Sequence, residues 1–151
     1  MIKHSETKIL NYTDEQMFKL VADIENYPHF IPWCEAVRIR SRYNDPEEKV
    51  DILTADMVVS FKVLRETLTC QVKLDPKLYI INVEYLSGPF NFLNNKWVFT
   101  QHENGCSVTF DVKFEFKSKI IQRLVGLIFH EAMKKIVKAF ERRALELYKT
   151  G

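Results

Sequence analysis

The residues of this chain that could perform catalytic or metal chemistry are its histidines and cysteines, and they are scattered along the sequence. His130 and Glu131 match the start of a zinc-protease helix, but Lys134 stands where that pattern requires the second histidine ligand. Cys34 could act as a nucleophile, yet no histidine is placed to be its base, so a packed thiol is the simpler interpretation. We therefore expect no metal site, no covalent cofactor and no enzymatic activity.

The glycines are too few and too widely spaced to form a phosphate-binding loop. The 151 residues include only Gly88, Gly105, Gly126 and Gly151, whereas an average composition would supply roughly ten glycines. Neither GxGxxG nor GxxxxGK[ST] can occur with this spacing, which excludes the common nucleotide-binding loops.

The cysteines and the N-terminus favour a cytoplasmic protein. Cys34, Cys70 and Cys106 are odd in number and form no CxxC pair, as expected for reduced, packed thiols. The first ten residues resemble neither a signal peptide nor a transit segment. The longest uncharged apolar run, Leu124–Phe129, is far shorter than the ~20 residues of a membrane-spanning helix. Peripheral contact with the inner membrane remains open.

Apolar side chains, rather than polar ones, are the candidates for a binding site. The chain has nineteen aromatic residues, many of them at positions expected to face inward. A guest with a long apolar body needs dispersion contacts along its length and few hydrogen bonds. The alternative is that these side chains simply fill the core. The candidates for the wall of an apolar cavity are Trp33, Met57, Phe61, Leu68, Val83, Phe90, Trp97, Phe99, Phe110, Phe114, Val125, Phe129 and Met133.

Periodicity and turn residues predict the elements that must position these side chains. A capping box at Thr13–Gln16 opens a helix that Pro28 ends, and residues 27–33 form at most a short helical turn. Cys106–Phe116 alternates apolar and polar residues most regularly. The other expected strands cover residues 3–11, 34–42, 49–59, 62–74, 78–86 and 96–102, and a long helix covers 118–149.

These elements predict one α+β domain spanning residues 1–151. Strands joined by short turns pair antiparallel, since parallel pairing needs long crossovers. Their apolar faces need a cover, and the terminal helix is the only large apolar element left. We expect a curved, seven-stranded antiparallel sheet wrapped around the C-terminal helix, in the order strand, helix, short helix, six strands, helix. A cavity can remain between the two.

Four motifs carry a resemblance to a known family. They are Tyr27–Cys34 (YPHFIPWC), Gly88–Phe90, Asn95–Trp97 and Ala139–Ala144. Together they resemble the coenzyme Q-binding START-domain family of the polyketide cyclase-like, helix-grip (START/Bet v1-like) superfamily. The resemblance covers essentially the whole chain. Val63 departs from the pattern, because the family has a glycine at that position.

The resemblance implies two different activities. Some members bind ubiquinone in an apolar cavity without catalysis and support respiratory electron transport. Bacterial members are also ribosome-association toxins that keep the two ribosomal subunits apart. A third interpretation, a small-molecule cyclase, would require an acid–base pair inside the cavity.

The outer face of the terminal helix offers a second candidate site. The face of this helix that we expect to meet the sheet and to form one wall of any cavity consists of Val125, Ile128, Phe129, Ala132, Met133, Ile136, Ala139, Phe140 and Leu147. On the opposite face, Ile120, Leu124 and Leu127 form an apolar patch. A cationic ridge follows on the same side, formed by Lys134, Lys138 and Arg142. Residues 117–149 carry nine Lys and Arg against three Glu, so a near-neutral chain contains a basic helix.

Three interpretations of this face stay open. Loops could cover the patch and leave the ridge solvated, the face could dock on an anionic membrane, or the ridge could contact ribosomal RNA. A row of Arg38, Arg40 and Arg42 either extends such a surface or pairs with acids on the neighbouring strand.

Overall fold

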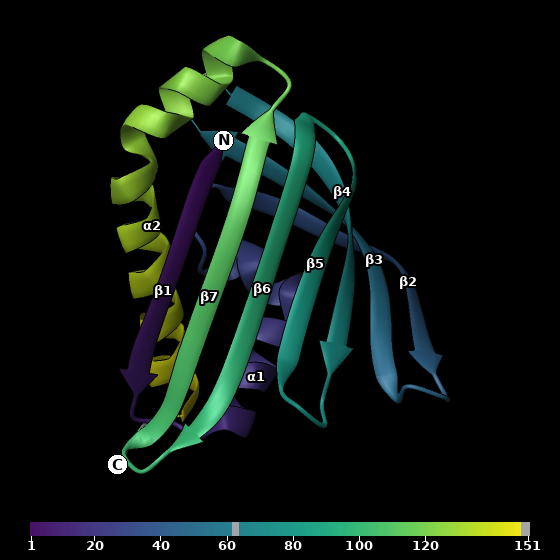
Figure 1. Ribbon diagram of the computed structural model, residues 1–151, viewed down its shortest axis with the longest axis vertical. Helices are drawn as coiled ribbons and strands as arrows, with labels where there is room; N and C mark the ends of the chain where they lie inside the picture. The colour runs from purple at the N-terminus through teal and green to yellow at the C-terminus, as the bar shows by residue number, and fades with distance from the viewer. Residues whose placement is uncertain (62–63, 149–151) are drawn as a thin grey trace.

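The computed structural model describes residues 1–61 and 64–148, and it shows a seven-stranded antiparallel sheet facing one long helix. The strand order is β1-β7-β6-β5-β4-β3-β2, so the strands from β2 to β7 lie side by side in sequence order and β1 pairs with β7 (Figure 1). The strands are β1 (Ile2–Leu10), β2 (Cys34–Asp45), β3 (Val50–Phe61), β4 (Leu64–Asp75), β5 (Ile80–Ser87), β6 (Phe90–His102) and β7 (Gly105–Phe116). The predicted α+β helix-grip fold is confirmed.

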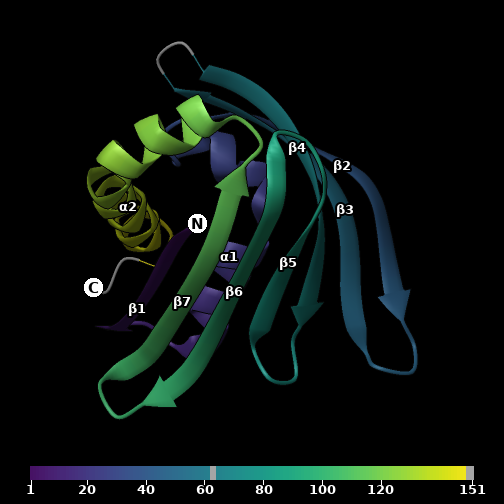
Figure 2. The ribbon, with the colours of Figure 1, turned by 45° about the horizontal axis from the view of Figure 1, so that its top comes forward.

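The sheet bends around the long helix α2 (Lys119–Tyr148), which crosses its concave side (Figure 2). Register shifts interrupt the β2–β3, β4–β5 and β6–β7 ladders. Irregularities of this kind bend a strand and increase its twist. The regular alternation predicted for 106–116 is confirmed, because Cys106, Val108, Phe114 and Phe116 are buried while the intervening side chains are more exposed.

Helix α1 (Asp14–Ala22) closes one end of the space under the sheet. The Thr13 hydroxyl accepts a hydrogen bond from the Gln16 amide at 3.0 Å, and the Gln16 side chain accepts one from the Thr13 amide at 2.9 Å. This is the predicted capping box. The buried face of α1 packs into the core through Met17, Phe18, Leu20 and Val21.

The end of that helix differs from the prediction. The α-helix ends at Ala22, and Pro28 lies inside a separate 3-10 helix, η1 (Ile24–His29). The Tyr27 hydroxyl donates to the carbonyl of Val21, one of the carbonyls that the end of a helix leaves free. This bond lets the chain leave the α-helix six residues before the proline.

The C-terminal half of α2 is anchored against the core, whereas its first turns are more exposed. Met133, Ala139, Phe140 and Ala144 are its buried residues. The Tyr148 hydroxyl donates to the carbonyl of Gln16 at 2.8 Å, which ties the end of α2 to α1. Leu147, predicted to face inward, is 48% exposed because Ala144 and Tyr148 take the inward positions there.

One further difference concerns a strand boundary. Strand β6 begins at Phe90 rather than at Lys96, since the residues after the Gly88-Pro89 turn pair at once with the end of β7. Val63, the departure from the family pattern, lies outside the described residues.

Within the described part of the chain, no helix is long and apolar enough to cross a membrane.

Substitution by alanine should change the stability of the fold in opposite directions at Gly105 and at Gly126. Gly105 has φ +130°, and a Cβ there would lie 2.2 Å from the carbonyl oxygen of Leu10. Gly105→Ala should therefore destabilise the fold by about 2–3 kcal/mol. Gly126, within α2, would place its Cβ no closer than 4.0 Å to Ile2, so Gly126→Ala should stabilise by about 0.5–1 kcal/mol. Urea unfolding of both variants measures the difference, and equal effects would contradict this account.

Candidate functional site

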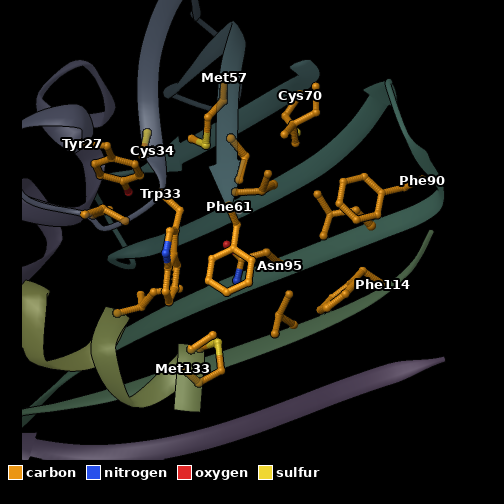
Figure 3. A pocket seen from close by; sticks show the side chains of 18 of the residues that line it. Tyr27, Trp33, Cys34, Met57, Phe61, Cys70, Phe90, Asn95, Phe114 and Met133 are labelled. Atoms are coloured by element: carbon orange, nitrogen blue, oxygen red, sulfur yellow. The ribbon is translucent and has the colours of Figure 1, made fainter. Parts of the chain in front are cut away.

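A cavity of about 390 Å³ lies between the concave face of the sheet and α2 (Figure 3). The side chains around it come from η1 and the turn after it, from the inner faces of β2 to β7, and from α2. Met133 extends from α2 toward the rings of Trp33 and Phe61, and Phe90 and Phe114 lie at the end away from Tyr27.

The cavity exists because α2 does not fill the width of the curved sheet. Its C-terminal half contacts α1, and the helix packs along β7. On the far side, β3, β4 and β5 turn inward-facing side chains such as Met57, Val72 and Val83 toward open space. On the helix side, one of the residues that line this space is the small residue Ala132.

All but one of the predicted wall residues line this cavity. They are Trp33, Met57, Phe61, Leu68, Val83, Phe90, Trp97, Phe110, Phe114, Val125, Phe129 and Met133. The prediction is wrong for Phe99, which is 1% exposed and packs edge-on against Phe18. Phe99 shares the inner face of β6 with Trp97, but it lies farther along the strand, where α1 covers the sheet.

Sequence reasoning missed the side-chain amide in this wall, that of Asn95. The strand was expected to begin at Lys96, so Asn95 fell outside the alternation that places Leu93 and Trp97 on the inner face. The earlier start of β6 brings it onto that face. The cavity is also lined by four residues of the expected inward face of the terminal helix, Ile128, Ala132, Ile136 and Phe140. Lining residues that were not predicted include Ile24, Tyr27, Ile31, Cys34, Ala55, Cys70 and Ile81.

Asn95 is held rigidly by two hydrogen bonds. Its Nδ2 donates to the carbonyl of Asp111 at 2.9 Å, and its Oδ1 accepts from Trp97 Nε1 at 3.1 Å. A side-chain amide has two N–H donors and two acceptor lone pairs. Each of its polar atoms therefore keeps one further bonding position.

The other polar groups in the wall include two thiols and a phenol. Burial raises the pKa of the Cys34 and Cys70 thiols to about 11, so both stay protonated and weakly nucleophilic at neutral pH. Burial also raises the pKa of Tyr27 above its usual value. Among the described residues that line the cavity there is no His, Asp, Glu, Lys or Arg. The acid–base pair that a cyclase interpretation requires is therefore not found among them.

An aromatic pair lies between η1 and β3. The rings of Trp33 and Phe61 meet edge-on with centroids 5.1 Å apart, and the Trp33 carbonyl accepts a hydrogen bond from the Ser60 amide at 2.9 Å. Trp33 has φ +68°, a left-handed conformation that is uncommon for a bulky residue. Such strain concentrates at binding sites, where the surroundings enforce it.

The outer face of α2 is exposed along its length. Ile120, Leu124 and Leu127 are 74%, 53% and 78% exposed, so neighbouring loops of the described chain do not cover the patch. Lys134, Lys138 and Arg142 are also exposed, and Lys134 lies 3.7 Å from Glu131.

Two members of the arginine row pair with acids instead of extending that surface. Arg40 donates to Asp56 at 2.6 Å, and Arg42 pairs with Glu25. Hydrogen bonds from Thr69 and from Arg40 lower the pKa of Asp56. No cluster of three or more His, Cys, Asp or Glu that could hold a metal ion occurs in residues 1–61 and 64–148.

Comparison with known proteins gives consistent matches over most of the chain. The sequence profile described as "Polyketide cyclase / dehydrase and lipid transport" matches residues 10–141. The ribosome association toxin RatA of Rickettsia prowazekii is 36% identical over 99% of this chain and 100% of its own length. The mitochondrial coenzyme Q-binding protein COQ10 homolog B of Xenopus laevis is 33% identical over 97% of this chain, which spans 59% of that protein.

A solved structure agrees with these matches. An 18 kDa protein from Caulobacter crescentus is 35% identical, with a TM-score of 0.83, over 99% of this chain and 100% of that one. Neither of the two named relatives is described as an enzyme, although the description of the profile includes cyclases. With the family profile covering most of the chain and these relatives nearly all of it, the chain belongs to the polyketide cyclase / dehydrase and lipid transport family.

Proposed function

We propose that this chain binds ubiquinone, or a polyprenyl lipid of similar chemistry, in the cavity between the sheet and α2, and does so without catalysis. The observation that carries the proposal is an apolar wall in which Asn95 is the one side-chain amide among the described lining residues. The similarity to a coenzyme Q-binding protein over nearly the whole chain supports the choice of ligand.

The size and lining of the cavity suit such a guest. Its volume of about 390 Å³ falls within the roughly 300–1,000 Å³ of small-molecule sites. Aromatic rings and the flexible side chains of Met57 and Met133 can adapt to a flat ring and to an isoprenoid chain. Dispersion contacts along the wall, rather than charges, would supply most of the affinity.

Asn95 is the candidate anchor for the polar end of the ligand. The second N–H of its Nδ2 can donate to a ring carbonyl, while the bonds to Asp111 and Trp97 hold the amide in place. A hydrogen bond of this kind is worth about 0.5–1.5 kcal/mol net. It would orient the ring but not dominate the affinity.

A second candidate function uses a different surface. The exposed ridge of Lys134, Lys138 and Arg142 fits a polyanion such as ribosomal RNA, and a relative 36% identical over its full length is a ribosome association toxin. Under this alternative the chain binds a ribosomal subunit and blocks association of the two subunits. Because the ridge faces away from the cavity, the two activities can be tested independently.

Filling the cavity should abolish ligand binding while the fold is retained. Ala132 lines the cavity on α2, so Ala132→Phe should place a ring in the empty space and weaken quinone binding at least tenfold, an order-of-magnitude expectation. Fluorescence titration with a short-chain ubiquinone, and mass spectrometry of organic extracts of the purified protein, measure this. His130→Phe adds a similar ring to the exposed side of the same helix and should bind as wild type. Saturable binding that Ala132→Phe leaves unchanged would rule out this cavity.

Removal of the amide should affect only ligands that carry an oxygen acceptor. Asn95→Leu should weaken binding of a quinone by about three- to tenfold, while a polyprenyl hydrocarbon without oxygen binds at least as well as before. Asn94→Leu is the matched control, because Asn94 is exposed and adjacent in the strand. Equal losses for the quinone and the hydrocarbon would argue against a head-group contact at Asn95.

Reversal of the ridge charges should abolish ribosome binding if the alternative function holds. Lys134→Glu, Lys138→Glu and Arg142→Glu together should prevent cosedimentation with ribosomal subunits, and wild-type binding should fall steeply with salt. Quinone affinity should survive, since none of the three lines the cavity. As a control, Lys96→Glu and Lys113→Glu reverse exposed charges on the sheet and should leave cosedimentation unchanged.

A further inference from the structure

The first turns of α2 have two apolar faces, although a helix that covers a sheet needs only one. Val125, Ile128 and Phe129 line the cavity. On the other side, Ile120, Leu124 and Leu127 follow one another at spacings of four and three residues, which places them in one row along the helix. All three are more than half exposed. Figure 1 shows these turns at the top of the molecule.

The charges in this stretch of the chain have one sign. Residues 117–130 contain no Asp or Glu, and Lys117, Lys119 and Arg123 are exposed cations. The first acidic residue of the helix, Glu131, comes only after the apolar row ends. An exposed apolar row flanked by cations is the pattern of a helix that lies in a lipid–water interface.

Two other occupants fit this surface less well. A second copy of the chain, docked through the same face, would bring the cations of residues 117–123 toward one another in a stretch that has no acid to pair with them. An RNA would meet the cations but would leave Ile120, Leu124 and Leu127 without an apolar partner. An anionic bilayer satisfies both features, since head groups take the charges and acyl chains take the side chains.

We propose that the first three turns of α2 form a docking surface for anionic membranes, made by Ile120, Leu124 and Leu127 with Lys119 and Arg123. This inference deepens the proposed function, on which its purpose rests. The docked turns are also the cavity wall, so a bound lipid would lie within one helix diameter, about 10 Å, of the bilayer. The surface is distinct from the ridge of Lys134, Lys138 and Arg142 farther along the helix.

Vesicle flotation of ligand-free protein tests the proposal. Wild-type protein should float with vesicles of phosphatidylglycerol and phosphatidylcholine, and more weakly with phosphatidylcholine alone. Ile120→Gln, Leu124→Gln and Leu127→Gln together should lower partitioning onto the mixed vesicles at least about tenfold. Leu145→Gln with Leu147→Gln is the matched control, because these leucines are 55% and 48% exposed on the same helix. Circular dichroism checks that every variant keeps its helix.

The outcomes separate this inference from the proposed ligand. Failure of the wild type to float, or flotation retained by the triple glutamine variant, overturns the docking surface. Flotation could instead depend on Lys134, Lys138 and Arg142 and be abolished by added RNA. That result would also overturn the proposed docking surface and would indicate a site for polyanions. Flotation that requires the apolar row, in a protein that binds no quinone, supports docking and contradicts only the cavity ligand.

Discussion

A wide, curved antiparallel sheet with an apolar concave face must be covered, and this chain has one long helix with which to cover it. Helix α2 is narrower than the seven strands that it faces. Its C-terminal half, with Phe140 and Ala144, joins α1 in a closed core. Toward β3, β4 and β5 the same helix leaves open space, and the apolar cavity follows from this mismatch.

That geometry concentrates both candidate activities on one element. The inward side of α2 forms a wall of the cavity through Val125, Phe129 and Met133. Its outward side carries an apolar row and then a cationic ridge. Because opposite faces of one helix carry these features, the chain can combine a cavity for an apolar guest with a surface for an anionic partner. Family relatives described as a coenzyme Q-binding protein and as a ribosome association toxin are consistent with such a division.

Most of the fold could be predicted because its elements have strong local signals. The capping box at Thr13–Gln16 and the alternation of Cys106–Phe116 are written in adjacent residues, and both are confirmed. The predicted element boundaries are wrong where contacts with residues distant in the sequence set them. The α-helix ends early because Tyr27 reaches back to Val21, and β6 begins early because the end of β7 is there to pair with it. Asn95 was missed because it lies in the part of β6 that this pairing adds.

The sequence by itself determined most of the side chains that face the concave side of the sheet, because strand and helix periodicities depend only on neighbouring residues. The tertiary structure alone decided which of those side chains meet packed neighbours and which meet open space. Trp97 and Phe99 share one face of β6, yet Trp97 lines the cavity and Phe99 is buried beside Phe18 of α1. That difference depends on where a helix from another part of the chain comes to rest, and no local pattern records it.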